Sequence, residues 1–328
     1  MSSGIGLLLF AIAALAAEPR RPVHTYSIVA RDPETGQIGV AVQSHFFAVG
    51  PIVPWAEAGV GAVATQSFVD PAYGPRGLLL MRTGLGAPAA LAGLLSQDQA
   101  ADVRQVAMVD AHGAVAAHTG ARCIDYAGDR TGDGWSVQAN MMGGDGVVDA
   151  MATAFEAAKG TLGERLVVAL EAAEAAGGDI RGRQSAALLV VAGEGTGRPW
   201  LGADVVVDLR VDDDPNPVVA LRRLLVLYEA YAHVNAGDVY VEKGDIEGAA
   251  REYAAGAALA PDNVEIAYWR ALTLATIGKV DESLPLFKDI FRREPVWVEL
   301  TRRLEKPGLL PPPEVVERIL SQAPRRAR

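Results

Sequence analysis

Residues 25–44, TYSIVARDPETGQIGVAVQS, decide how the first part of the chain folds. Residues 25–30 are rich in β-branched and apolar side chains, which favour a strand. Asp32, Pro33 and Gly36 follow within a few positions, and these residue types are typical of a turn. Residues 38–44 return to small and β-branched side chains. The pattern therefore predicts a hairpin of two antiparallel strands.

The chain alternates between strand and helix patterns from this hairpin as far as residue 209. Further strands are predicted at 61–66, 104–109, 114–119, 135–140, 186–192 and 204–209. Helices are predicted at 76–83, 87–95, 147–158 and 162–176. Strands joined by hairpins pair antiparallel, and helices that arrive in pairs must cover sheet faces. This order favours an α+β fold in which two antiparallel sheets pack face to face between helical layers. A simple two-layer α+β fold remains open.

A different pattern follows residues 212–217, DDDPNP, which we interpret as a solvated linker. Residues 230–263 and 264–297 are two segments of equal length with the period of tetratricopeptide repeats, which they resemble. The residues that fit this motif are Gly237, Tyr240, Gly244, Ala249, Tyr253 and Pro261 in the first, and Ala271, Leu274, Gly278, Phe287 and Pro295 in the second. A helix at 218–231 and a cap at 301–304 and 314–320 complete an all-helical region, 218–328. We expect it to bind a protein partner or a second copy of the chain, as in a homodimer.

Composition excludes several classes of protein. The chain has 328 residues and a net charge of −10, which argues against nucleic-acid partners and against anionic membrane surfaces. Its single cysteine, Cys123, excludes an internal disulfide and a thiolate zinc site. The five histidines are scattered along the sequence. No metal and no organic cofactor is predicted.

The first residues indicate the cellular location of the protein rather than its fold. Residues 5–17, IGLLLFAIAALAA, form an apolar run that is shorter than the roughly 20 residues a membrane-spanning helix needs. Such a run is typical of a signal-peptide core, and residues 14–16 offer a small-x-small cleavage pattern. The segment before it contains no Lys or Arg, so a buried N-terminal helix or a later start codon stays open. We predict a signal peptide over 1–17 and a periplasmic or secreted protein, with a cytoplasmic location as the alternative.

The first domain resembles a known family through several motifs in a fixed order. These motifs are TYSIVA at 25–30, SHFFAVG at 44–50, PWA at 54–56, GVGAVATQ at 59–66, YGPRG at 73–77, TGARC at 119–123, QANM at 138–141 and GRQSAAL at 182–188. Together they resemble the domain-of-unknown-function 1028 family, which is placed in the N-terminal-nucleophile (Ntn) hydrolase superfamily. The resemblance implies a four-layer αββα sandwich over residues 25–211. It implies no particular substrate.

The superfamily resemblance also implies a catalytic residue. Ntn hydrolases use the first residue of the first strand as nucleophile and its free α-amine as base, and Thr25 matches that position. An α-amine with an ordinary pKa of about 7.7–8.0 is partly neutral near neutral pH. Asn140 is the candidate oxyanion donor, although a hydrogen bond at a strand end is the alternative. A free amine requires cleavage between His24 and Thr25, and His24 departs from the glycine often found at that place.

Candidate substrate-binding residues follow a glycine-rich turn. They are Arg183, Gln184 and Ser185, together with Ser44 at the end of the second strand. Arg183 could bind a carboxylate in a bidentate manner, or it could form an ion pair with Asp179 or another acid.

These observations lead to two functional hypotheses. The first is an exported Ntn-type amidohydrolase that cleaves a small amide or peptide-like bond and carries a repeat arm for protein interaction. The alternative is a catalytically inactive Ntn-like scaffold that binds proteins through its helical repeats.

Overall fold

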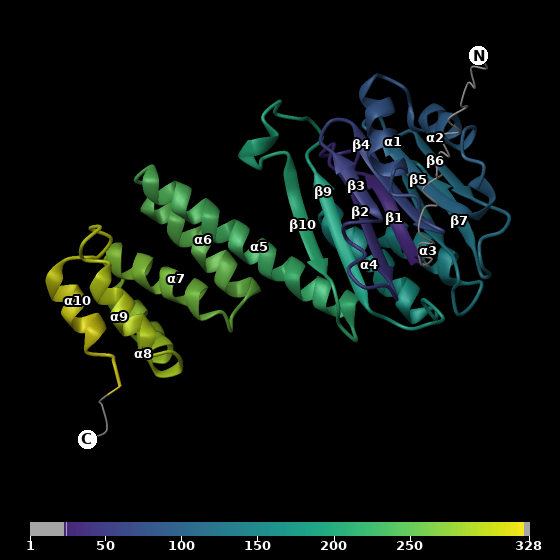
Figure 1. Cartoon of the computed structure of the whole chain (residues 1–328). Helices are drawn as coiled ribbons and strands as arrows, with labels where there is room; N and C mark the ends of the chain where they lie inside the picture. Colours follow the sequence, from purple (N-terminus) through teal and green to yellow (C-terminus); the bar gives the residue numbers. More distant parts are fainter. Residues whose placement is uncertain (1–22, 24, 325–328) are drawn as a thin grey trace, which may run out of the picture. The chain divides into compact units, whose positions relative to one another are not determined.

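The computed structural model describes Val23 and residues 25–324, without the side chain of Leu201. The expected signal peptide, residues 1–17, lies outside this range. The chain forms two compact units, one ending at Val218 and one beginning at Val219 (Figure 1). Among the described residues, no helix is both long enough and apolar enough to cross a membrane.

The first unit contains two antiparallel sheets. The six-stranded sheet has the order β10-β9-β2-β1-β8-β7, so that β10 and β7 are its edges. Its strands are β1 (Thr25–Arg31), β2 (Ile38–Ser44), β7 (Gly128–Gly132), β8 (Trp135–Ala139), β9 (Ser185–Val191) and β10 (Val205–Val211). The four-stranded sheet has the order β3-β4-β5-β6. Its strands are β3 (Pro54–Glu57), β4 (Gly61–Ser67), β5 (Arg104–Asp110) and β6 (Val115–Thr119).

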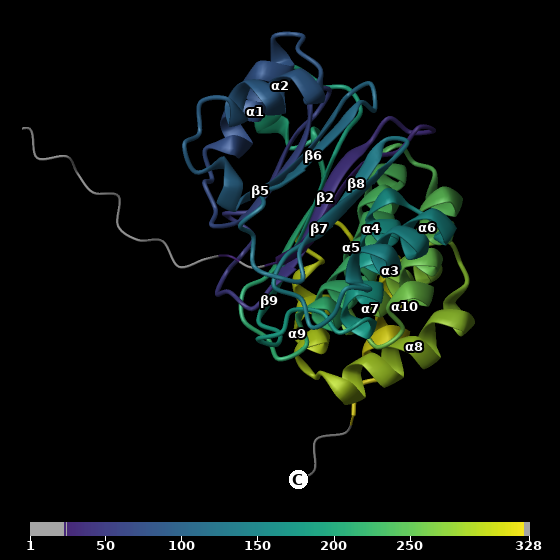
Figure 2. The same cartoon turned by 90° about the vertical axis from the view of Figure 1, so that its right-hand side faces the viewer.

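Each sheet carries a pair of helices on one face. Helices α1 (Tyr73–Arg82) and α2 (Ala87–Leu95) pack on the four-stranded sheet through a cluster that includes Val63 and Met108. Helices α3 (Val147–Ala157) and α4 (Leu162–Ala175) pack on the six-stranded sheet. Figure 2 shows the two helix pairs on opposite sides of the strands.

The remaining faces of the two sheets pack against each other. Val29 and Val40 of the six-stranded sheet and Ala64 and Ala107 of the four-stranded sheet share one buried apolar cluster. Successive side chains of a strand point to opposite faces, so alternate residues of β1, β2, β4 and β5 enter this cluster. The side chains between them point toward the helices.

Local chemistry explains the turn between β1 and β2 and the start of α4, both at the end of the hairpin away from Thr25. In the β1–β2 turn, the Asp32 carboxylate accepts a hydrogen bond of 3.2 Å from the Thr35 amide, and Gly36 adopts a φ of 73°. Glycine reaches this left-handed conformation without steric cost. Helix α4 begins with a capping box between Thr161 and Glu164, which satisfies two amides of its first turn.

The second unit is entirely helical in its described part. Its elements are α5 (Pro217–Glu242), which begins just before the boundary, α6 (Ile246–Leu259), α7 (Val264–Thr276), α8 (Val280–Arg293), α9 (Val296–Arg303) and α10 (Pro313–Leu320). The Asp245 carboxylate accepts from the Gly248 amide at 2.8 Å, and the Asn263 side chain accepts from the Ile266 amide at 3.1 Å. These caps fix where α6 and α7 begin. A Cβ at Gly237 would lie 2.8 Å from the Tyr253 ring, so the small residue allows α5 and α6 to approach.

The prediction of antiparallel sheets followed by an all-helical region is confirmed. Two strands, β3 and β7, were not predicted. The helix predicted at 218–231 is longer than expected, because it continues to Glu242 as one helix and supplies the first helix of the first repeat.

Candidate functional site

Four polar side chains lie at one end of the six-stranded sheet. Thr25 opens β1 opposite Ser44, the last residue of β2, and Ser44 in turn lies opposite Ser185, the first residue of β9. Directly opposed residues in antiparallel strands point to the same face, so the three form a row that faces the four-stranded sheet. Asn140 follows β8 immediately. All four residues are fully buried.

Thr25 and Asn140 are brought together through the Thr25 backbone. The Thr25 carbonyl accepts hydrogen bonds from the Asn140 amide at 3.1 Å and from Asn140 Nδ2 at 3.4 Å. Asn140 Nδ2 also donates to Gln105 Oε1 at 2.8 Å. Asn140 therefore fixes the start of β1 and ties it to the four-stranded sheet.

Three glutamines complete a polar network between the sheets, and no role in the site was predicted for them from the sequence. Gln66, Gln105 and Gln138 are fully buried. Gln66 Nε2 donates to the Thr25 carbonyl at 3.2 Å and to Gln105 Oε1 at 2.7 Å. Gln138 Nε2 donates to Ser27 Oγ at 2.6 Å, and Ser27 Oγ donates to Gln66 Oε1 at 2.6 Å. A glutamine within an otherwise apolar strand is the sequence signal that could have identified them.

Val23 closes this end of the sheets. Its amide donates to the Ser67 carbonyl at 2.8 Å, and its carbonyl accepts from the Ser67 amide at 2.8 Å. The same Val23 carbonyl oxygen accepts a hydrogen bond of 3.0 Å from Thr25 Oγ1. One oxygen atom is therefore held jointly by the Thr25 hydroxyl and a backbone amide of β4.

The other predicted substrate-binding residues bind groups of the protein itself. Arg183 forms an ion pair with Glu174 of α4, and its Nη1 donates to Asn216 Oδ1 at 3.0 Å. Asp179, the acid considered for this pairing, instead binds Arg181 at 2.7 Å. The Arg183 side chain is 47% exposed, so part of the guanidinium faces solvent.

Gln184 and Ser185 hold neighbouring segments in place. Gln184 Nε2 donates to Asp213 Oδ1 at 3.1 Å, which fixes part of the segment interpreted as a linker. Ser185 Oγ donates to the Phe46 carbonyl at 2.5 Å and accepts from the Val49 amide at 3.2 Å. Both side chains therefore order the loops around the row of Thr25, Ser44 and Ser185.

Tyr26 lies on the opposite face of β1, toward α4. Its hydroxyl donates a hydrogen bond to Glu174, the partner of Arg183. Burial, followed by the negative charge of Glu174, raises the pKa of Tyr26 well above its ordinary value. Tyr26 therefore remains protonated and acts as a donor that orients Glu174.

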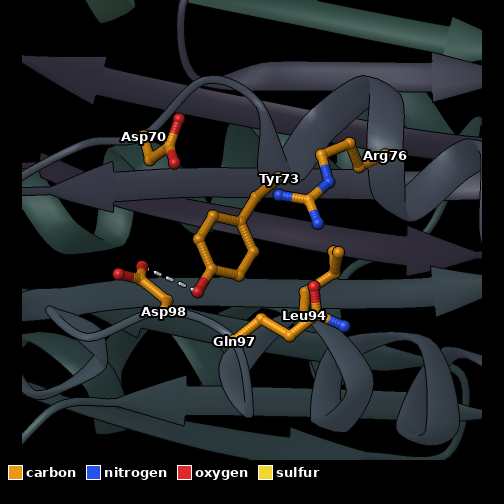
Figure 3. Close-up of a pocket in the computed structure, with 6 residues that line it drawn as sticks. All are labelled: Asp70, Tyr73, Arg76, Leu94, Gln97 and Asp98. Carbon is orange, nitrogen blue, oxygen red and sulfur yellow. Dashed lines mark hydrogen bonds between the residues drawn. The ribbon is translucent and has the colours of Figure 1, made fainter. Parts of the chain in front are cut away.

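A small polar pocket lies on the helix-covered side of the four-stranded sheet (Figure 3). It has a volume of ≈ 120 Å³ and is lined by Asp70, Tyr73, Arg76, Leu94, Gln97 and Asp98. Tyr73 points its hydroxyl at Asp98 across 3.0 Å, and Arg104 binds the same carboxylate at 2.8 Å. Arg104 also donates to the Phe68 carbonyl, next to Ser67. The ion pair of Asp98 and Arg104 beside the pocket thus supports the strand end that holds Val23.

Burial and charge set the protonation of these groups. Burial, followed by the Asp98 hydrogen bond, raises the pKa of Tyr73. Burial alone would also raise the pKa of Asp98, but hydrogen bonds from Arg104, the Ala100 amide and Tyr73 outweigh it and leave that pKa lowered. Asp98 is therefore a carboxylate near neutral pH.

Within the part of the chain that the structure describes, no group of three or more His, Cys, Asp or Glu side chains could hold a metal ion. Cys123 is free and buried, and burial raises the pKa of its thiol. A buried, protonated thiol is a poor nucleophile.

Comparisons with known proteins identify both parts of the chain. The model of the family described as "Family of unknown function (DUF1028)" matches residues 25–221, and a model described as "TPR repeat" matches residues 237–278. A crystal structure of a protein from Silicibacter pomeroyi, described with the same DUF1028 family model, is similar with 35% identity and a TM-score of 0.55. The similarity covers 62% of this chain and 88% of that one. None of the curated proteins matches. The repeat match indicates a protein-interaction arm.

Proposed function

The chain belongs to the DUF1028 family of unknown function, and we propose that its first unit is an exported amidohydrolase that acts on a small amide or peptide-like bond. Thr25 is the nucleophile of this reaction, after cleavage of the bond between His24 and Thr25. The resemblance to Ntn hydrolases supports this assignment. The observation that carries it is the 3.0 Å hydrogen bond from Thr25 Oγ1 to a backbone carbonyl oxygen, which places a hydroxyl beside an amide.

The proposed reaction has two steps. Thr25 Oγ1 attacks the carbonyl carbon of the substrate, and the neutral α-amine of Thr25 accepts the hydroxyl proton. The C–N bond of the substrate then breaks, and its amine leaves with that proton. Water attacks the resulting ester, releases the carboxylic acid and regenerates the hydroxyl. The neighbouring residues have supporting roles: Asn140 and Gln66 hold the Thr25 carbonyl, which fixes the direction of the α-amine.

The partly exposed Arg183 is the proposed contact for an anionic group of the substrate. It lies on the loop before β9, whose first residue, Ser185, belongs to the same row as Thr25. Glu174 neutralises part of its charge, so a substrate carboxylate would bind the solvent-facing side of the guanidinium.

Two measurements test the proposal: the intact mass of the protein and its rate of amide turnover. The intact mass of the protein, purified from its native host, is expected to begin at Thr25. Turnover of a panel of N-acyl aminocoumarin amides should then be lost in Thr25→Ala and retained in part in Thr25→Ser, which keeps the hydroxyl. A mass that includes residues before Thr25, or unchanged turnover in Thr25→Ala, would contradict the proposal. Cell fractionation tests export in the same preparation.

A second candidate function rests on a groove in the helical unit. The groove has a volume of ≈ 690 Å³, and Tyr231, Trp269 and Leu309 are among the residues that line it. Asp238, Glu242 and Glu265 also line it, whereas its described lining contains no Lys or Arg. Charge complementarity therefore favours a partner segment with basic and apolar residues. In the alternative hypothesis, this groove carries the whole function and the first unit is a silent scaffold.

Peptide binding to the full chain tests this candidate. A fluorescent peptide of alternating Leu and Arg should bind, and a Leu/Glu peptide should not. Glu242→Lys should weaken binding of the basic peptide about tenfold, which corresponds to about 1.4 kcal/mol. Glu282→Lys, an exposed reversal on α8 away from the groove, should leave binding unchanged. Equal binding of both peptides would exclude a charge-selective groove.

A further inference from the structure

We infer that the place filled by Val23 is the substrate site of the first unit, and that it takes an extended peptide residue with a branched apolar side chain. The Ser67 amide binds the carbonyl oxygen of that residue. This inference rests on the proposed function, because the site opens only when the chain before Thr25 is removed. Val23 is then a built-in occupant of the site in the uncut chain.

The backbone of Val23 is held as a bound peptide would be. Both of its hydrogen bonds to Ser67 measure 2.8 Å, one in each direction, as in one step of an antiparallel ladder. An extended substrate residue can make the same two bonds by adding to the strand end. Its main chain is thereby fixed before the chemistry begins.

Ser67 keeps its orientation for reasons independent of Val23. It has a φ of 69°, in the left-handed region that residues other than glycine rarely adopt, so the surrounding structure must hold it there. The next residue is fastened on both sides: the Phe68 amide donates to the Val103 carbonyl at 3.3 Å, and Arg104 binds the Phe68 carbonyl. Removal of Val23 therefore leaves the Ser67 amide aimed at the same place.

The Val23 side chain has a built apolar pocket. It is 1% exposed and belongs to the cluster between the sheets, with Val49, Val53 and Val69. If Val23 were only part of a segment that is cut off, its side chain would not need to be buried in this cluster. Once it leaves, the cluster retains a space of the size and shape of a branched aliphatic side chain, which a charged side chain cannot fill without losing its hydration.

The position of the Val23 oxygen connects binding to the reaction. This oxygen lies 3.0 Å from Thr25 Oγ1 and 2.8 Å from the Ser67 nitrogen. A substrate carbonyl in its place has its oxygen within hydrogen-bond reach of both the nucleophile's hydroxyl and a rigid amide donor. A fixed donor about 2.7–3.1 Å from a developing oxyanion is the arrangement that acyl transfer requires. The Ser67 amide is thus a catalytic donor that does not depend on a side chain.

The experiment uses the full chain, so that binding is measured without turnover. Val23→Asp should release the segment from its pocket, and hydrogen exchange of the Ser67 amide, followed by NMR, should become at least a hundredfold faster. The probe acetyl-Pro-Val-His-amide should then restore protection of that amide, whereas acetyl-Pro-Asp-His-amide should not. The uncut protein that keeps Val23, whose site is occupied, should bind neither peptide.

Two results would overturn the inference: unchanged protection of Ser67 in Val23→Asp, or equal rescue by both peptides. Where Val23→Asp does not give a folded spectrum, Val23→Gly removes the side chain without a buried charge and is read by the same criteria. The outcomes also separate the two proposals. Selective rescue without turnover of amides by the cut chain supports the site and contradicts the hydrolase. Turnover of amides with no preference for a branched apolar residue supports the hydrolase and contradicts the site at Val23.

Discussion

Gln66 and Gln105 lie opposite each other on β4 and β5, and Gln66 Nε2 donates a hydrogen bond of 2.7 Å to Gln105 Oε1. Gln105 Nε2 continues to the six-stranded sheet, where it donates to the Ala139 carbonyl at 2.8 Å. The two sheets are therefore joined by apolar packing along most of their length and by buried amides at the end that holds Thr25. Such a network is stabilising only while every member has its partner.

Gln105→Leu should destabilise the first unit by about 2–4 kcal/mol, because the Ala139 carbonyl and Asn140 Nδ2 each lose a hydrogen bond inside the protein. Urea denaturation, monitored with a spectroscopic probe in the first unit, measures the change in the free energy of unfolding. Gln99→Leu is the matched control, since Gln99 is exposed and its replacement should cost less than about 0.5 kcal/mol. Equal stability of the two variants would contradict the network.

Asp98→Asn should lower stability at pH 7 by about 1.5–3 kcal/mol, the usual range for a hydrogen bond to a charged group. The folded pKa of Asp98 is lowered from 3.8, so its contribution is present above that pH and is lost as the pH falls through the folded pKa. The difference between the variant and the unchanged protein should therefore shrink below about pH 4. The exposed Asp133→Asn is the control, and a constant difference across pH would refute the assignment.

Gly74→Ala should destabilise α1, because the added Cβ would lie 2.3 Å from the Trp55 ring. Relief requires a shift of the indole or of the helix, which we expect to cost about 1–3 kcal/mol. Gly93→Ala, within α2, meets no atom within 4 Å. It should stabilise by about 0.5–1 kcal/mol through helix propensity alone. Thermal melts of the two variants should thus move in opposite directions.

Thr301→Val should act on the helical unit alone. The Tyr268 hydroxyl and Thr301 Oγ1 form a buried hydrogen bond of 2.9 Å, and valine leaves the tyrosine without this partner. We expect a loss of about 1–3 kcal/mol in the helical transition. Thr276→Val, an exposed change on α7, is the control. A shift confined to the transition of the first unit would disprove the assignment.

Sequence periodicity predicted the central strands well, because residues 25–44 combine alternation with an unmistakable turn, and the strands β1 and β2 begin and end within one residue of the predicted bounds. It missed β3 and β7 for physical reasons. Strand β3 has four residues and starts with proline, and β7 reads GDRTG, with no large apolar side chain. Their conformation comes from pairing with β4 and β8, which is a tertiary effect.

The site was only partly accessible to sequence reasoning. Thr25 could be nominated because it opens a strand. The glutamine network could not, since Gln66, Gln105 and Gln138 come from three strands in two sheets and meet only after the sheets pack. An acidic partner was predicted for Arg183, but the acid named was Asp179, whereas the structure pairs Arg183 with Glu174. Glu174 becomes its neighbour because the chain reverses through Gly177 and Gly178, both with positive φ.

The six-stranded sheet ends at β10 and β7, and an edge strand offers unpaired amides and carbonyls to any other extended chain. Both edges carry exposed charges of each sign. Asp208 and Arg210 on β10 bind each other at 3.1 Å, and Asp129 and Arg130 project from β7. A further strand added at either edge would have to strip these charges of water. The charged edges therefore protect the protein against aggregation through edge-to-edge pairing of strands from different molecules.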